Sequence, residues 1–409
     1  MRGTWIRTLA RGLKAALTIF IVAVFSLLAA ELIARNFFGL ETLDYRRPYH
    51  PIFVSGDYHY LVPNDRLPFV PGGAVALGYR ERTMGFFTES DKPSHTATRF
   101  ADYLFAHNRS RYRADEVDRI SCTQKDAILV HVLGGSVAQG FTTFDSAHTW
   151  HARLEGTLRQ RLQRDDVYMF NAAMGAFISL QERLAYHLAV APRRANLVLI
   201  INGYNDVALP ANSGVFPGDP FQLGMRFSQL LTDGFWWWAA QHSAIAHTLL
   251  QNAFNDDIVR FRARLEKDDA LFALYADAVA ENYIENMHDV LDACRARGQA
   301  CLVGLQPARS VTAENIGVRF DDIISQPRIV ALYRRLQDKI ATSRHRESFI
   351  DLTGVFNRGE RLQYFHDSVH PNLAGHQRLA QELLRPTMTA LSTAKPVPAS
   401  SYERCARLR

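Results

Sequence analysis

The chain contains little cysteine, with only four among 409 residues. It contains no CxxC and no HExxH motif, so the sequence predicts no metal site. Cys294 and Cys301 are seven positions apart and can pair if the intervening turn brings their Cα atoms together. Cys122 and Cys405 are the other two, and spacing alone leaves disulfides and free thiols both open. Four cysteines fit an exported body.

The body of the chain also lacks an excess of either charge. Of the formal net charge of +6, +4 lies in residues 1–35 and +2 in the tail from Glu403. Nucleic-acid binding needs a basic face on a folded domain, so we expect no nucleic-acid partner. With 47% apolar and 22% charged residues, the composition is that of a globular protein, large enough for one large or two modest domains.

One long stretch near the N-terminus is almost free of charge. Residues 15–34 hold only Glu31, and twenty helical residues span about 30 Å, the thickness of a bilayer core. Positive residues precede the stretch, which predicts a cytoplasmic N-terminus, a single transmembrane anchor within residues 1–35 and a periplasmic body. A cleaved signal peptide is the alternative. Candidate cleavage pairs such as Leu28 and Ala30 put Leu where a small residue is needed, which favours an uncleaved anchor.

The rest of the chain divides by composition. Residues 36–126 are rich in proline and aromatics, and we expect an extended connector with short strands that packs on the body. Residues 127–391 are expected to form the main domain, with a helical insertion at about 207–297, and residues 392–409 a tail.

Apolar strands alternate with helices throughout the main domain. Strands are expected at residues 128–133, 167–171, 197–202, 301–305 and 348–352. Helices are expected at residues 149–162, 178–190, 270–297, 328–344 and 372–384. Continuous apolar strands alternating with helices predict an α/β fold, with a five-stranded parallel sheet between two helical layers.

The first strand runs into the sequence Gly134-Gly135-Ser136-Val-Ala-Gln-Gly140. A short apolar run that ends in Gly-Gly predicts a buried strand followed by a tight turn. A serine in such a turn, before a helix, exposes its hydroxyl for nucleophilic attack. The structural alternative is an ordinary tight turn in which the serine caps the helix.

Polar residues follow the other strands at the same sheet edge, where ligands bind in such sheets. His370 can act as the base for Ser136, and Asp367 can orient the imidazole. Backbone N–H groups at Ser136 and at Gly175 or Ala176, together with the Asn205 side chain, can donate to an oxyanion. Supporting roles are expected of Gly135, Gly203 and Asp206, which border these groups.

These blocks together resemble the SGNH (GDSL-type) hydrolase superfamily. That family carries Ser, Gly, Asn and His in this order, with an Asp three residues before the His. Ser136, Asn205, Asp367 and His370 match it residue by residue. The resemblance covers residues 127–391 and implies a flavodoxin-like sheet, a Ser-His-Asp mechanism, ester substrates and no cofactor. The anchor and the connector look like those of membrane-tethered bacterial members.

The sequence departs from the family pattern in two places. Gly135 stands where the family often has Asp. In the second block, Ala176 falls in the expected glycine place, with Gly175 directly before it. A backbone donor survives with either residue, so the pattern does not exclude activity.

Three of the five tryptophans of the chain are consecutive, in Phe235-Trp236-Trp237-Trp238. Such a cluster fits a membrane interface, an acyl or sugar site, or a helix that is buried on several sides. The sequence does not choose among these three.

The favoured hypothesis is an exported, membrane-anchored serine esterase that acts on O-acyl groups of an envelope polysaccharide or lipid. Two alternatives stay open. An acyltransferase would pass the acyl group to a sugar hydroxyl through the same chemistry. A silent envelope binding or assembly protein would keep the fold without the reaction, against which the complete set of polar residues argues.

Overall fold

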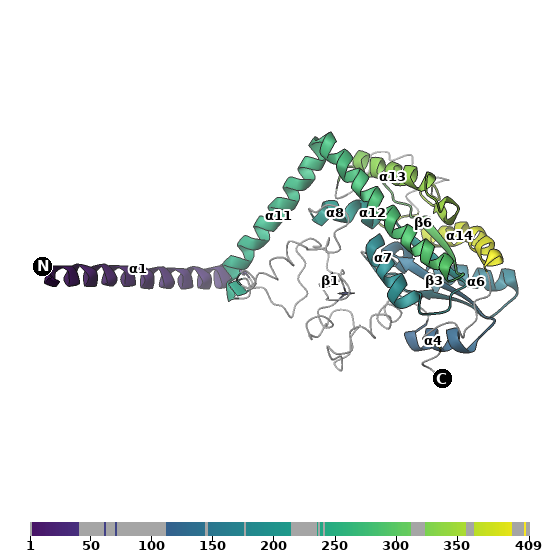
Figure 1. The fold of residues 1–409 in the computed structure, drawn as a ribbon, viewed down its shortest axis with the longest axis horizontal. Helices are drawn as coiled ribbons and strands as arrows, with labels where there is room; N and C mark the ends of the chain where they lie inside the picture. Colours follow the sequence, from purple (N-terminus) through teal and green to yellow (C-terminus); the bar gives the residue numbers. More distant parts are fainter. Residues whose placement is uncertain are drawn as a thin grey trace.

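The sheet at the centre of the body is parallel throughout. The computed structural model describes residues 2–40, 61–62, 70–71, 112–143, 146–175, 177–213, 235, 238–239, 242–311, 324–356, 364–394 and 405. The strands are β3 (Ile128–Gly134), β4 (Val167–Asn171), β5 (Leu197–Asn202), β6 (Ala300–Leu305) and β7 (Phe349–Asp351). Their order is β4-β3-β5-β6-β7 (Figure 1). This is the flavodoxin-like order, and it confirms the expected fold.

Helices cover both faces of the sheet. They are α6 (Trp150–Leu162), α7 (Ser179–Ala185), α12 (Asp269–Ala296), α13 (Gln326–Ala341) and α14 (Leu373–Thr393). The crossovers through α6 and α7 run in opposite directions along the sheet, and right-handed connections therefore put these helices on opposite faces. α6 packs against α14, whereas α7 and α13 pack against α12.

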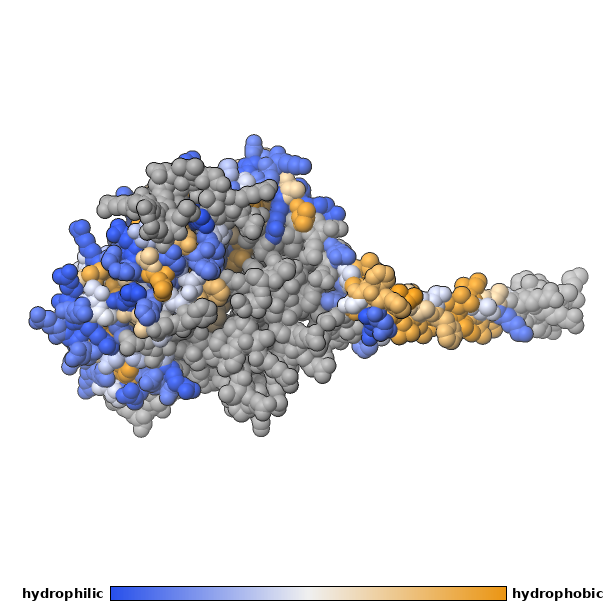
Figure 2. Space-filling model, turned by 180° about the vertical axis from the view of Figure 1, so that it is seen from behind, coloured by the Kyte–Doolittle hydropathy of each residue, from blue (hydrophilic) through white to orange (hydrophobic). Residues whose placement is uncertain are grey.

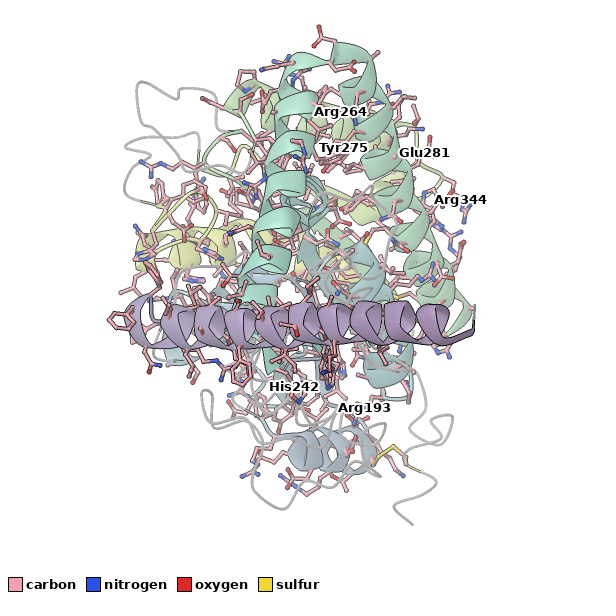
Figure 3. All side chains as sticks on the ribbon, turned by 90° about the vertical axis from the view of Figure 1, so that its left-hand side faces the viewer. Arg193, His242, Arg264, Tyr275, Glu281 and Arg344 are labelled. Carbon is pink, nitrogen blue, oxygen red and sulfur yellow. A yellow bond between two sulfur atoms is a disulfide. The ribbon has the colours of Figure 1, made fainter. Side chains whose placement is uncertain are left out.

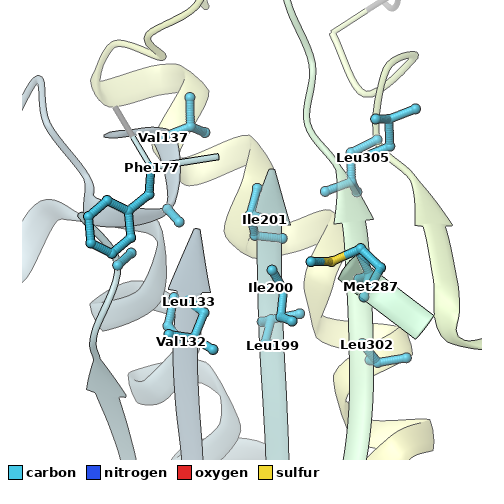
Figure 4. Close-up of a cluster of buried hydrophobic side chains, with 14 of the residues drawn as sticks. Val132, Leu133, Val137, Phe177, Leu199, Ile200, Ile201, Met287, Leu302 and Leu305 are labelled. Atoms are coloured by element: carbon cyan, nitrogen blue, oxygen red, sulfur yellow. The ribbon is translucent and has the colours of Figure 1, made fainter. Parts of the chain in front are cut away.

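The core lies between these layers. All six residues of β5 are buried, as are six of the seven residues of β3. Leu133, Ile201 and Leu305 belong to one continuous cluster that extends to the carboxyl ends of the strands (Figure 4). Because both faces of the strands are covered, the strands are apolar without alternation, which is why they could be recognised in the sequence.

Several expectations for the helices need correction. The closing helix extends to Thr393 rather than residue 384, through Pro386. The second helix ends as a π-helical turn at Tyr186–Val190. A helix not expected from the sequence, α8 (Tyr204–Ser213), follows β5 directly.

The end of the connector is helical, so the expectation of extended chain is wrong for these residues. α4 (Ala114–Thr123) is fixed to the body by a 2.8 Å ion pair between Asp118 and the buried guanidinium of Arg193. A charge in the core needs such a partner, and the pairing therefore orders the segment. Short strands were expected, and β1 (Leu61–Val62) and β2 (Val70–Pro71) do pair, antiparallel. Residues 41–60, 63–69 and 72–111 of the connector lie outside the described residues.

Two long helices extend from the body. α1 (Arg2–Phe37) contains the segment Gly12–Phe37, which is long and apolar enough to cross a membrane. α11 (Ala244–Lys267) lies within the expected helical insertion. It begins beside the end of α1 and leads to α12 (Figure 1). Trp236 and Trp237 lie outside the described residues.

All four cysteines form disulfides. Cys294 pairs with Cys301, and their Cα atoms are 6.2 Å apart. Cys122 of α4 pairs with Cys405, with a Cα–Cα distance of 5.3 Å across a sequence separation of 283. The second disulfide joins the C-terminal tail to α4, beneath the sheet (Figure 1).

The two disulfides should differ in their effect on stability. Loop closure by Cys122–Cys405 restricts the unfolded chain far more than closure by Cys294–Cys301. The chain-entropy estimate gives a difference of about 3 kcal/mol. We expect the pair Cys122→Ser and Cys405→Ser to lower the free energy of unfolding more than the pair Cys294→Ser and Cys301→Ser, as measured by urea denaturation. Equal losses would show that loop closure does not set the contribution of either bond.

Candidate active site

Ser136 lies at the carboxyl end of β3, at the first residue of the short helix α5 (Ser136–Gln139). Gly134 has a φ of 138°, and Gly135 is the N-cap residue of the helix. A Cβ atom on Gly134 would lie 2.1 Å from the carbonyl oxygen of Ile201 in β5. Only glycine therefore allows the serine turn to pack this closely on the neighbouring strand.

His370 and Asp367 approach Ser136 from the loop that precedes α14. The Nε2 atom of His370 lies 2.7 Å from Ser136 Oγ, and its Nδ1 atom lies 2.6 Å from Asp367 Oδ2. Asp367 Oδ1 accepts the backbone N–H groups of Val369 and His370, at 2.9 and 2.8 Å. The loop is closed by a bridge between Phe365 and Pro371. These contacts form a serine–imidazole–carboxylate relay, as the spacing of the sequence predicts.

The carboxyl group of Asp367 stays ionised at neutral pH. Partial burial opposes its charge, but hydrogen bonds from the His370 ring and from two backbone N–H groups lower its pKa to about 2. The carboxylate can therefore hold the Nδ1 proton of His370 and stabilise the imidazolium that forms when the Nε2 atom accepts a proton.

Asn205 lies beside the serine turn, on the first turn of α8. Its Nδ2 group donates to the carbonyl oxygen of Phe177 at 2.8 Å. A Cβ atom on Gly135 would lie 2.5 Å from this nitrogen, so the amide is directly against the turn. A Cβ atom on Gly175 would lie 4.0 Å from Ser136 Cβ, so the second block also lies close to Ser136. Ala176 lies outside the described residues.

Gly203 and Asp206 flank Asn205 and fix its position. Gly203 has a φ of 110°, and a Cβ atom there would lie 2.5 Å from Leu305 in β6. The buried Asp206 accepts the backbone N–H of Ser179 at 3.0 Å and its hydroxyl at 2.5 Å. Ser179 follows Phe177 by two residues, so Asp206 holds the segment whose carbonyl receives the Asn205 amide.

A buried polar network continues behind Asp206, and little in the sequence indicated it. Asn286 of α12 donates to Ser179 Oγ at 3.0 Å. Asn202 donates to Glu182 of α7, and Tyr283 of α12 donates to Asn202 at 2.9 Å. The one sequence signal was the polar Asn202 at the end of an apolar strand.

The network holds two carboxyl groups, Glu182 and Asp206, both fully inside the protein. Burial, followed by the negative charge of Asp206, raises the pKa of Glu182 well above its usual range. Burial also raises the pKa of Asp206 to about 6, against the hydrogen bonds from Ser179 that lower it. The protein therefore favours protonation of this pair.

The fold and these contacts define a candidate active site at the carboxyl ends of the strands, beside the topological switch point between β3 and β5. The chain belongs to the GDSL-like lipase/acylhydrolase family, whose pattern matches residues 132–378. It is thus an ester-hydrolysing enzyme. No curated protein matches the chain.

Solved structures with a similar fold include several esterases. A lipase/acylhydrolase from Enterococcus faecalis is 13% identical, with a TM-score of 0.40 over 66% of this chain and 98% of that one. The acetyl xylan esterase AlAXEase is 14% identical, with a TM-score of 0.36 over 63% of this chain and 99% of that one. A catalytic mutant of Axe2, an acetylxylan esterase from Geobacillus stearothermophilus, is 14% identical, with a TM-score of 0.38 over 64% and 95%.

A methyl group on Gly135 should displace the Asn205 amide without unfolding the protein. Loss of one oxyanion donor typically lowers kcat by about 10²–10³-fold, and we expect Gly135→Ala to fall in this range. The measurement is the hydrolysis of p-nitrophenyl acetate. Gly156→Ala is the control, because a Cβ atom there meets nothing within 4 Å. A wild-type rate for folded Gly135→Ala would show that the amide is not needed in its present position.

The raised pKa of Asp206 predicts a pH dependence of stability. The contribution of the protonated Asp206 side chain to the free energy of unfolding is fully present below the unfolded pKa near 4. This contribution is lost as pH rises through about 6. We expect the free energy of unfolding of Asp206→Asn to fall less than that of the wild type between pH 4 and 7, as measured by urea denaturation at a series of pH values. Parallel curves for the two proteins would contradict this assignment.

Proposed function

We propose that the chain is an exported, membrane-anchored serine esterase in which Ser136 is the nucleophile, His370 the general base and acid, and Asp367 the residue that orients it. The single observation that carries the proposal is the 2.7 Å separation of Ser136 Oγ and His370 Nε2, with Asp367 2.6 Å from the other ring nitrogen. A serine hydroxyl needs a base at this distance to become an effective nucleophile.

The reaction proceeds in two acyl transfers. Ser136 Oγ attacks the ester carbonyl while His370 Nε2 takes its proton, and the same proton then passes to the leaving alkoxide, which departs as an alcohol. A water molecule next gives a proton to His370 and attacks the acyl-enzyme. Return of that proton to Ser136 Oγ releases the carboxylic acid and restores the enzyme.

The oxyanion of each tetrahedral intermediate lies between three donors in this proposal. They are the N–H groups of Ser136 and Gly175 and the side-chain amide of Asn205. Asn205 uses one amide hydrogen on the Phe177 carbonyl, which leaves the second for the oxyanion. The closeness of Gly175 to Ser136 supports it as the second-block donor.

Two observations support an exported body held by an anchor at residues 1–35. Gly12–Phe37 is helical and apolar over a length that can cross a membrane. Both disulfides join parts of the body, and structural disulfides persist in oxidising compartments. In that location, with residues 127–391 as the hydrolase domain, the substrate class is O-acyl esters of an envelope polysaccharide or lipid.

The nucleophile can be tested on the full-length protein. Ser136→Ala should lower kcat for p-nitrophenyl acetate by at least about a thousandfold, because the proposed acyl-enzyme forms on the Ser136 hydroxyl. A fluorophosphonate probe should label Ser136 in the wild type and leave the variant unlabelled. Ser392→Ala, which removes an exposed hydroxyl on α14, should keep both properties. Labelling at another serine, or an active Ser136→Ala, would refute the assignment.

A further inference from the structure

The end of the anchor helix is joined to the beginning of α11 by one carboxylate. Glu31 accepts the backbone N–H groups of Ala244 at 2.6 Å and Ile245 at 3.3 Å, and the Ser243 hydroxyl at 2.8 Å. The N–H groups of Ala244 and Ile245 belong to the first turn of α11, where backbone donors have no partner within the helix. The helix dipole favours a negative charge at this end. Glu31 thus caps a helix more than 200 residues away in sequence.

Arg35 completes this junction from the next turn of α1. Its Nε atom lies 2.7 Å from Glu31, and its Nη2 group donates to the carbonyl oxygen of His242 at 2.8 Å. Glu31 is the only charged residue in the apolar run 15–34. A charge in a membrane segment is costly unless it is paired, and here it has four donors. We name Glu31, Arg35 and the first turn of α11 the anchor clamp.

Exposed aromatic side chains gather around the clamp from both parts of the chain. Phe37 and Phe38 at the end of α1 are 83% and 73% exposed, and Phe235 and Trp238, which precede α11, are 63% and 57% exposed. Trp238 stacks on His242 with ring centroids 4.9 Å apart. The apolar surface of α1 continues to the place where it meets the body (Figure 2). We name these four aromatic residues the interfacial patch.

We propose that the interfacial patch lies in the headgroup layer of the bilayer that α1 crosses, and that the anchor clamp holds it there. Large exposed apolar side chains are unfavourable in water, and aromatic rings concentrate at membrane interfaces, where one part of the ring is apolar and another is wet. The patch adjoins the apolar span directly, so the bilayer is the surface that covers it. The proposal rests on α1 as the anchor.

The clamp also connects the membrane to the proposed oxyanion site. Phe261 of α11 packs edge-on against Tyr275 of α12, with ring centroids 6.2 Å apart. The Tyr275 hydroxyl donates to the carbonyl oxygen of Val207, two residues after Asn205. Tyr275 lies between α11 and α12 in Figure 3. The body is therefore attached to the membrane through packed helices as well as through the chain itself.

Lipids with bromine atoms test the depth of Trp238. The full-length protein is reconstituted into phosphatidylcholine vesicles brominated either near the headgroup or near the acyl-chain ends. We expect the fluorescence that Trp238→Phe removes to be quenched by shallow bromine more than by deep bromine. The control places a tryptophan at exposed Leu274 in the Trp238→Phe background. Leu274 lies near the start of α12, and α11, which is about 36 Å long, separates the start of α12 from the clamp, so bromine should not quench a tryptophan at this site.

The clamp is tested by Glu31→Ala, with Glu285→Ala at an exposed site of α12 as its control. Glu31→Ala should stay in the membrane after a carbonate wash but lose the shallow quenching of Trp238, whereas Glu285→Ala should keep it. Unchanged quenching in Glu31→Ala would overturn the clamp. A membrane-bound wild type with unquenched Trp238 would overturn the patch alone. Recovery of the wild type in the soluble fraction would overturn the anchor and the patch together.

Discussion

The close packing of β3 on β5 is the constraint on which the site depends. A side chain on Gly134 would strike the backbone of Ile201, and one on Gly135 would strike the amide of Asn205. Without these side chains, the turn after β3 lies directly against the end of β5. The Ser136 hydroxyl and the Asn205 amide therefore lie close together. The loop that carries Asp367 and His370 then brings the His370 imidazole to the hydroxyl.

The segment that contacts the Asn205 amide is held by buried polar groups as well as by apolar packing. Asp206 fixes Ser179, and Ser179 in turn fixes the carbonyl that receives the Asn205 amide. Burial of the charged forms of Asp206 and Glu182 costs stability. The raised pKa values of both carboxyl groups reflect this cost. In return, the Asn205 amide at the start of α8 is held in one orientation, which the proposed role as an oxyanion donor requires.

Contacts between distant parts of the chain connect this rigid centre to its surroundings. A disulfide ties the C-terminal tail to α4, and the Asp118–Arg193 pair ties α4 to the sheet. At the other end of the molecule, Glu31 caps α11 and so makes the N-terminal helix part of the folded structure. Removal of α1 would leave the first turn of α11 without this acceptor.

The sequence by itself determined the strands, their parallel arrangement and the identities of Ser136, Asp367 and His370. These features depend on neighbouring residues: apolar runs of strand length, a glycine turn, and an Asp three residues before a His. Only the tertiary structure decided the helical form of α4, the partner of Cys122, the burial of Glu182 and Asp206 in one region of the core, and the capping of α11 by Glu31. Each of these features depends on contacts between residues that are separated in the chain. A local sequence pattern does not show which distant groups will pack together.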